Sequence, residues 1–402
     1  MMKPNFARNN YWFIIVAIFC LDLVVFISEL GSIATLKSIV LAYSFICYYI
    51  VLKYCDTFRL KHTDYIWYLL YLFILFLTVR LIVDFAIKGY TLFLYKSILT
   101  LFFIYFSTIV LPLLFFSRYM VKIPILKLAW TIGVLLAVCL SYSVFNIFSG
   151  KGIITTGGQI SAKGIDIIYF GHLGTSLFIV GLFLLRQAKD MIRLLLCIVF
   201  VIIGILCVSF SGERGPFVAL IVCTIVYLLI QNKWSASKVV LTAIVVITFV
   251  KLLPQLVLLL HKQLLKINIS SLYKISVFIS GGVEKSGNDR VPIYDNGLDI
   301  ISDNPFLGFS YLMPNQSYVH NIFIESFMAT GIIGGLFFMI INIRVLQFGY
   351  KLSRLNNVYT LFYLLFIQYL IYGFVSRTLI ALPQYWLMMV LVLSCYEYAK
   401  SE

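Results

Sequence analysis

Apolar runs of about 20 residues recur from one end of this 402-residue chain to the other, and they constrain its fold more than any other feature. Each run is long enough to cross roughly 30 Å of hydrocarbon as a helix. Lipid offers backbone amides no hydrogen-bond partner, so a chain that crosses it forms helices or a closed barrel. Barrel strands alternate apolar and polar residues, whereas runs such as VVLTAIVVITFV do not. The pattern therefore predicts an all-α polytopic membrane protein.

The composition agrees with this prediction. Only 12% of the residues are charged and 62% are hydrophobic, whereas an ordinary soluble domain carries roughly 25% charged residues. We expect one integral membrane domain over residues 1–402, with about twelve transmembrane helices. The expected spans are 11–29, 34–52, 65–83, 92–116, 128–148, 165–185, 194–210, 216–231, 239–258, 321–341, 358–375 and 379–396.

Lys and Arg residues are distributed unevenly between the expected connections. With the N-terminus in the cytoplasm, the even-numbered connections are cytoplasmic and hold many more Lys and Arg residues than the short odd-numbered ones. This asymmetry is the positive-inside pattern, and it predicts the orientation. Long loops escape the rule, so a large outer-face loop at 259–319, between helices nine and ten, does not contradict it. The net charge of +15 forms no basic domain, so we expect no nucleic-acid partner.

Several patterns that would indicate metal or nucleotide chemistry are absent from the sequence. The eight cysteines lack CxxC spacing and none lies in the 259–319 loop, so we expect no disulfide or zinc framework. The sequence has no D-x-D, no HExxH and no P-loop motif. We therefore expect no metal site and no cofactor, and neither metal-dependent glycosyl transfer nor ATP hydrolysis has its usual residues.

The segment SFSGERGPF places Arg214 in a tight turn between helices seven and eight. Gly212 and Gly215 permit the turn, and Pro216 suits the first turn of the next helix. An arginine beside the free amides of a helix N-terminus makes an anion site. The alternative is that Arg214 extends to the membrane interface or pairs with Glu213.

The outer-face loop and the helix after it supply the next candidates. The segment DRVPIYDNGLDIISDNPFLG predicts a short helix that begins after Arg290, is capped by Asp289 and ends before Pro305. His320 and Asn321 open helix ten, with Asn321 as its N-cap. A histidine beside the positive end of a helix tends to stay neutral, which a general base requires. Glu325, one turn further, could orient a partner.

The remaining polar residues give weaker signals. His172, at the outer end of helix six, could face a cavity, although a satisfied polar group at a helix end is as good an interpretation. Arg377, between the last two helices, is a further candidate anion contact. Arg80 and Asp84 are interpreted as side chains that extend to the interface.

Taken in order, these segments resemble the O-antigen polymerase and O-antigen ligase family of bacterial envelope enzymes. The SGERG turn is similar to the family's Ser-x-x-Arg-Gly turn, and the stretch from Arg290 through NPFLGFS to HNIFIESFMATGIIGG is similar to its signature. The similarity covers roughly residues 205–340. Glu213, directly before the key arginine, is a departure from the family's pattern.

The resemblance implies what the candidates do. Arg214 and Arg290 would hold the diphosphate of an undecaprenyl-linked oligosaccharide, and His320 would act as acid or base. From the residues themselves, and not from the resemblance, we expect Asn321, Glu325, Arg377 and His172 to help bind the substrate. The expected location is the bacterial inner membrane, with the site on the periplasmic or extracellular face. The lipid bilayer and, in the same pathway, a chain-length regulator and a flippase are the expected partners.

The resemblance leaves the function open between alternatives. A polymerase would pass a glycan to a sugar hydroxyl on another lipid-linked repeat unit, whereas a ligase would pass it to lipid A core. The many Ile, Phe, Tyr and Asn residues lean weakly toward a polymerase from a low-GC polysaccharide gene cluster. A transporter or flippase of lipid-linked sugars is less favoured, since ionisable residues gather on the outer face and no inverted halves are detected.

Overall fold

The computed structural model describes residues 64–87, 89, 98–117, 124–148, 153–154, 160–161, 166–231, 259, 290–315 and 317–401. Within these ranges the regular elements are helices, apart from one short antiparallel hairpin in which Ile153 pairs with Ser161. The elements are α5 (Tyr65–Leu81), π-helix η3 (Ile82–Ile87), α6 (Ile98–Tyr105), π-helix η4 (Phe106–Val110), α7 (Leu111–Phe116), α8 (Ile125–Phe148), β1 (Ile153–Ile154), β2 (Ile160–Ser161), α9 (Ile167–Leu185), α10 (Met191–Ser211), α11 (Arg214–Gln231), α14 (Val291–Asp303), α15 (Ile322–Leu355), 3-10 helix η6 (Asn357–Tyr359), α16 (Thr360–Val375) and α17 (Pro383–Ser401).

The all-α membrane architecture predicted from the sequence is confirmed, but the number of twelve spans is not. Seven helical segments of the described residues are long and apolar enough to cross a membrane. The expected spans 11–29, 34–52 and 239–258 lie outside the described residues, and α17 corresponds in position to the last one. The seven segments are Tyr65–Ile87, Ile125–Asn146, Ile167–Leu185, Met191–Ser211, Arg214–Gln231, Ile322–Leu355 and Asn357–Val375.

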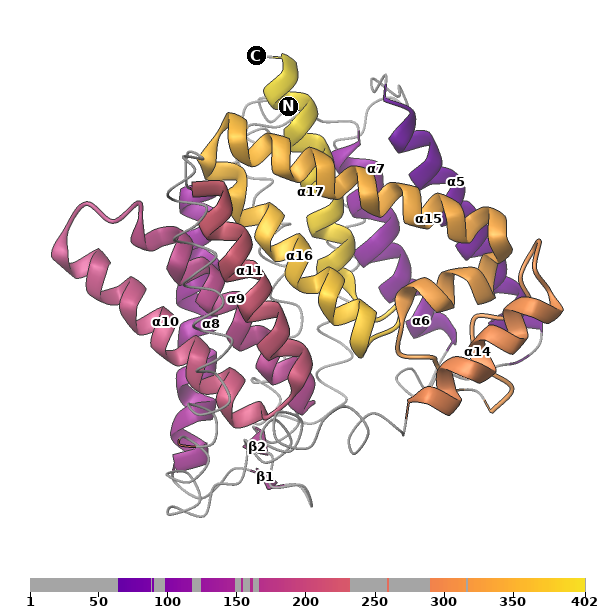
Figure 1. Ribbon diagram of the computed structural model, residues 1–402, viewed down its shortest axis with the longest axis horizontal. Coiled ribbons are helices and arrows are strands. Elements are labelled where there is room, and N and C mark those ends of the chain that lie inside the picture. The colour runs from indigo at the N-terminus through magenta and orange to yellow at the C-terminus, as the bar shows by residue number, and fades with distance from the viewer. Residues whose placement is uncertain are drawn as a thin grey trace, which may run out of the picture.

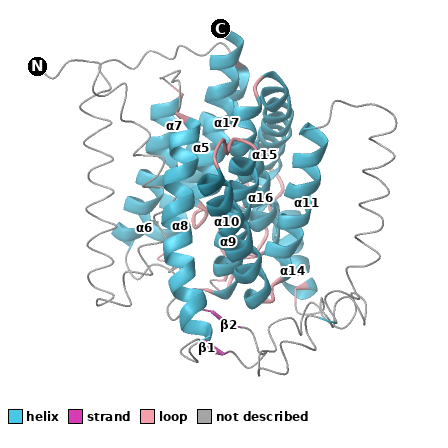
Figure 2. Cartoon of the chain, turned by 90° about the vertical axis from the view of Figure 1, so that its left-hand side faces the viewer, coloured by secondary structure: helices cyan, strands magenta, loops and turns pink. Residues whose placement is uncertain are grey.

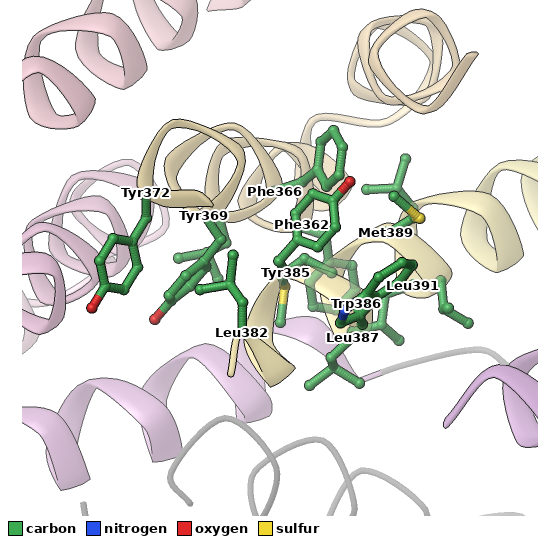
Figure 3. Close-up of a cluster of buried hydrophobic side chains, with 14 of the residues drawn as sticks. Phe362, Phe366, Tyr369, Tyr372, Leu382, Tyr385, Trp386, Leu387, Met389 and Leu391 are labelled. Carbon is green, nitrogen blue, oxygen red and sulfur yellow. The ribbon is translucent and has the colours of Figure 1, made fainter. Parts of the chain in front are cut away.

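The core is centred on α16 and α17, whose aromatic side chains interlock (Figure 3). Tyr385 stacks on Phe366 with ring centroids 5.7 Å apart and meets Trp386 edge to face at 5.2 Å. The polar tips of both α17 aromatics are satisfied, because the Tyr385 hydroxyl donates to Asn342 and the Trp386 indole N–H donates to the Leu379 carbonyl. α17 is therefore a central helix, and the turn that leads into it is held firmly.

α9 and α10 approach each other closely through glycines. A Cβ on Gly174 would lie 2.8 Å from the Gly204 carbonyl oxygen, and a Cβ on Gly204 would lie 2.6 Å from the Gly174 carbonyl oxygen. Small residues allow such approach between membrane helices, where no hydrophobic effect drives association. This packing fixes the N-terminal end of α9 beside the turn between α10 and α11.

α15 is broken at Gly331, which has φ 67° and ψ −169°. We refer to residues 322–330 as the first half of α15. The Met328 carbonyl accepts from the N–H groups of Phe309 and Ser310, while the Ile332 N–H donates to the Pro305 carbonyl. The loop after α14 thus supplies the hydrogen bonds that the helix loses at the break.

α14 and the first half of α15 lie together at the end of the molecule opposite the C-terminus (Figures 1 and 2). The short helix predicted in the outer-face loop is confirmed, and it ends before Pro305 as expected. The predicted cap is wrong, because Arg290 occupies the N-cap position and its side chain makes no capping bond. Its guanidinium is therefore available for a contact elsewhere.

Candidate functional site

The turn between α16 and α17 is where the candidate residues meet. α16 ends at Val375, so the last carbonyl groups of the helix lack partners within it. Arg290 Nη1 donates to the Val375 carbonyl, and His320 Nδ1 lies 3.3 Å from the Ser376 carbonyl oxygen. Two residues that are 30 positions apart in the sequence are thus joined to adjacent carbonyls of one helix end.

His320 is held in an unusual backbone conformation. Its φ of 62° lies in the left-handed region, where it is the only non-glycine residue among those described. Such conformations cost of order 1–3 kcal/mol and gather at functional sites. The imidazole packs against the Tyr318 ring at a centroid distance of 4.2 Å. The next residue, Asn321, caps α15 as predicted, with Oδ1 accepting from the N–H groups of Phe323 and Ile324.

The surroundings of His320 keep its imidazole neutral. Burial lowers its pKa below 6.5, and the positive charges of Arg290 and Arg377 lower it further. The Ser376 carbonyl and Asp166 oppose this shift without reversing it. In the tautomer in which Nδ1 donates to Ser376, Nε2 carries a lone pair and can accept a proton. The ring therefore has the protonation state of a general base.

Arg214 and Arg290 form the positive part of the site. Gly212, with φ 60°, ends α10, and Arg214 is the first residue of α11. The charge of Arg290 acts on Arg214, and the carboxylate of Glu213 acts on it in the opposite sense. Each arginine stands at a helix N-terminus, where free backbone N–H groups and the helix dipole add positive potential. The two arginines that the sequence singled out thus lie within electrostatic range of each other.

Arg377 is engaged with the N-terminal end of α9. Its Nη2 lies 3.2 Å from Asp166 Oδ2, and its Nε donates to the Tyr372 hydroxyl. The guanidinium carbon also lies 5.5 Å from the ring centroid of Tyr169. A substrate anion would have to compete with these contacts for the Arg377 N–H groups. Arg377 therefore contributes mainly its positive charge to the site.

His172 lies deeper, one turn into α9, and is completely buried. Its ring stacks on Tyr372 at a centroid distance of 3.8 Å. Neither ring nitrogen has a hydrogen-bond partner among the residues that the structure describes. A Cβ on Gly215 would lie 3.4 Å from His172 Nε2, so His172 sits directly beside the N-terminal turn of α11.

Glu325 supports the α16–α17 turn. Its side chain is fully buried, and Oε2 accepts from the Leu379 N–H at 2.8 Å. The neighbouring Ile380 N–H donates to the Tyr311 hydroxyl. Glu325 therefore holds the backbone of the turn that carries the Ser376 carbonyl, and its carboxylate does not reach the surface.

Sequence reasoning missed the role of Arg80, and the expectation that it extends to the interface is wrong. Its guanidinium donates to the carbonyls of Leu307, Gly308, Phe309 and Ala329 at 2.6–3.1 Å. Asp84 is likewise fully buried, not extended, and accepts from the Tyr311 N–H at 2.6 Å. The available signal was an Arg and an Asp spaced i, i+4 in an otherwise apolar run, which indicates buried partners.

No group of three or more His, Cys, Asp or Glu residues able to hold a metal ion occurs in the part of the chain that the structure describes. What the site offers is positive charge at two helix N-termini beside a neutral imidazole. This arrangement can bind an anion and accept a proton next to it.

Comparison with known proteins gives one family match. Residues 198–339, which include the Arg214 turn, α14 and the His320 segment, match a family model described as O-antigen ligase. A search of curated proteins finds no match.

Proposed function

We propose that this chain, whose residues 198–339 match the O-antigen ligase family model, is a membrane enzyme of polysaccharide biosynthesis that polymerises lipid-linked oligosaccharide repeat units. The donor is an undecaprenyl-diphosphate-linked glycan, and the acceptor is a sugar hydroxyl of a second lipid-linked repeat unit. The convergence of Arg290 and His320 on adjacent carbonyls of the α16–α17 turn, with the charge of Arg290 acting on Arg214, is the observation that carries the proposal.

The proposed reaction is a metal-independent glycosyl transfer. His320 Nε2 takes the proton of the acceptor hydroxyl while the oxygen forms a bond to the anomeric carbon of the donor. The bond from that carbon to the diphosphate oxygen breaks, and its electron pair leaves with the diphosphate. General base catalysis of this kind contributes about 10²–10⁴-fold in rate.

Arg214 and Arg290 stabilise the charge that grows on the departing diphosphate. Guanidinium groups bind phosphate oxygens in pairs, and helix N-termini add potential of the same sign. In a site that excludes water, such stabilisation is usually the largest catalytic contribution. Glu213 reduces the net charge at Arg214, so Arg290 carries the greater share of the binding in this chain.

The proposal includes a location. The excess of Lys and Arg residues on the even-numbered connections supports an N-terminus in the cytoplasm of a bacterial cell. The site then lies on the periplasmic or extracellular side of the inner membrane, where the 259–319 loop joins helices nine and ten. A chain-length regulator and a flippase of the same pathway are the proposed partners.

The experiment is chain growth from purified lipid-linked repeat units in the presence of a chelator. His320→Asn suits this test because asparagine tolerates a positive φ better than alanine does. We expect His320→Asn to lose at least 100-fold in rate, and Arg290→Lys to lose activity because lysine cannot bind two phosphate oxygens at once. Arg193→Gln, a change of an exposed arginine at the other end of α10, should behave as wild type. Unchanged chain growth in a well-folded His320→Asn protein would end the proposal.

A ligase is the second candidate, because the matching family model carries that description. The donor site would be the same and only the acceptor would differ. Supplying the purified protein with lipid A core and a finished lipid-linked polymer distinguishes the two functions. Transfer to the core without growth of the polymer would identify a ligase.

A further inference from the structure

The backbone of the loop between α14 and the break in α15 faces the rest of the protein, where it is bonded to α5 and α15. We refer to Pro305–Phe309 as the tip loop. Four of its five carbonyl groups accept hydrogen bonds from protein donors, because Ile332 N–H donates to Pro305 and Arg80 donates to residues 307–309. The Phe309 N–H donates to the Met328 carbonyl. Much of the polar backbone of the tip loop is therefore bonded to the rest of the protein.

The side chains of the tip loop point outward and are apolar. Phe306 is 70% exposed, Leu307 is 76% exposed and Phe309 is 41% exposed. In water, such a patch of large apolar side chains would be unfavourable. The bonded carbonyl groups would keep their partners in hydrocarbon, where non-helical backbone is tolerated only if protein or a water-filled cavity lies against it.

The tip loop is continuous with surfaces that face lipid. Arg80, which binds its carbonyls, lies between Val79 and Ile82, and both of these neighbours are exposed. On the other side of the break, Ile332 and Ile333 of the spanning helix α15 are exposed as well. Figure 1 shows the loop beside the end of α5 and the bend of α15. Exposed apolar side chains are thus carried by three segments that these hydrogen bonds bring next to one another.

The neighbouring helix α14 differs from the tip loop because it exposes carboxylates in addition to the apolar Val291 and Leu298. Asp295, Asp299 and Asp303 are all exposed along it. Carboxylates are costly to place in hydrocarbon, so α14 faces water. Between Asp303 and Phe306 the exposed side chains change from charged to apolar, which marks the boundary between water and hydrocarbon within three residues.

We propose that the tip loop is embedded in the hydrocarbon of the outer leaflet, with lipid acyl chains as its partner. Gly331 lies nine residues into α15, so the loop reaches at most about 14 Å beyond the start of that helix, which is about half of the hydrocarbon thickness. The inference does not require glycosyl transfer. Under the proposed function, it places the diphosphate site at the level of the lipid headgroups, so a lipid-linked substrate reaches it without leaving the bilayer.

Cysteine reactivity in proteoliposomes of the full-length protein tests the proposal. A thiol in hydrocarbon does not ionise and reacts slowly with N-ethylmaleimide, since the thiolate is the nucleophile. We expect Leu307→Cys to react at least tenfold more slowly than Asn296→Cys, an exposed position on α14. Reaction at the peptide that carries each new cysteine is read by mass spectrometry, and both variants should react equally after denaturation in SDS. Reaction of Leu307→Cys within threefold of Asn296→Cys would overturn the proposal.

A second measurement separates lipid from protein as the cover. Leu307→Trp and Asn296→Trp are reconstituted with lipids brominated on their acyl chains, which quench only indoles that contact them. The emission added by Leu307→Trp should be quenched at least twofold more than that added by Asn296→Trp. Slow thiol reaction without this quenching would mean that protein covers the loop, and it would also overturn the proposal. Neither readout depends on catalytic activity, so failure here leaves the proposed function untouched.

Discussion

Replacing Arg80 by methionine removes four hydrogen bonds and keeps most of the volume of the side chain. The guanidinium donates to Leu307, Gly308, Phe309 and Ala329, and it lies 3.9 Å from Asp84. Methionine has no donor, so the four carbonyls lose their partner at once. Asp84 also loses the positive charge beside it.

The magnitude follows from the number and setting of these bonds. Hydrogen bonds between membrane helices contribute about 0.6 kcal/mol on average, whereas bonds to charged groups in soluble proteins contribute roughly 1.5–3 kcal/mol. Four bonds at the lower value give about 2.4 kcal/mol. Because the guanidinium is 17% exposed, the upper value does not apply in full. We expect Arg80→Met to lower the free energy of unfolding by about 2–4 kcal/mol.

The assay is equilibrium unfolding in mixed micelles of increasing SDS content, followed by circular dichroism. Arg193→Met is the matched control, because Arg193 is more than half exposed and pairs only with Asp190 in the contacts that the structure records. Its loss should stay within about 0.5 kcal/mol, as is usual for surface ion pairs. An Arg80→Met protein as stable as the control would refute the role assigned to Arg80. Arg80→Lys should fall between the two, since an ammonium group cannot reach all four carbonyls.

Three further outcomes are expected. Gly331→Ala should destabilise the protein by about 3 kcal/mol or more, because the alanine Cβ would lie 2.1 Å from the Phe306 carbonyl oxygen. Gly89 has a similar φ of 70° but open space around it, so Gly89→Ala should cost only about 1 kcal/mol in the same SDS titration. Glu325→Leu should lower the free energy of unfolding by about 1–3 kcal/mol, because it leaves the buried Leu379 N–H without an acceptor. Glu325→Gln keeps an acceptor oxygen and should retain most of the wild-type stability. Equal losses of stability in the two variants would contradict this assignment. Under the proposed function, His320 acts as a base only above its lowered pKa, so the rate of chain growth should fall as the pH drops through that pKa. Asp166→Asn removes a charge that raises this pKa, so the acidic limb of the pH–rate profile should move to lower pH. A limb that stays in place or moves to higher pH would count against this assignment.

The sequence predicted the parts of the site that depend on local structure. Asn321 caps α15 because a side-chain oxygen before an apolar run can accept the first free N–H groups. Gly212 ends α10 with a positive φ, which leaves Arg214 at the start of the next helix. The roles proposed for these residues in catalysis remain predictions, because geometry alone does not test them.

The support beneath the site could not be predicted in the same way. Arg80 binds Leu307 at a separation of 227 residues, and no helical periodicity carries information about such a contact. The break at Gly331 lies in an apolar run that reads as one continuous helix, and it becomes intelligible only once the Pro305 carbonyl is seen to replace the lost bond. The expected cap at Asp289 was wrong for a related reason, since the loop places Arg290 at that position to reach Val375.

The break in α15 also sets residues 290–331 apart from the long part of that helix. Residues 290–331 join the long part of α15 through a single glycine and are anchored to earlier helices by Arg80 and Asp84. A chimera that receives this segment from another family member would need to keep those two anchors and the Leu379 amide that Glu325 binds. Such a chimera would replace the segment that holds Arg290 and His320 while the packing of the other helices stays as it is.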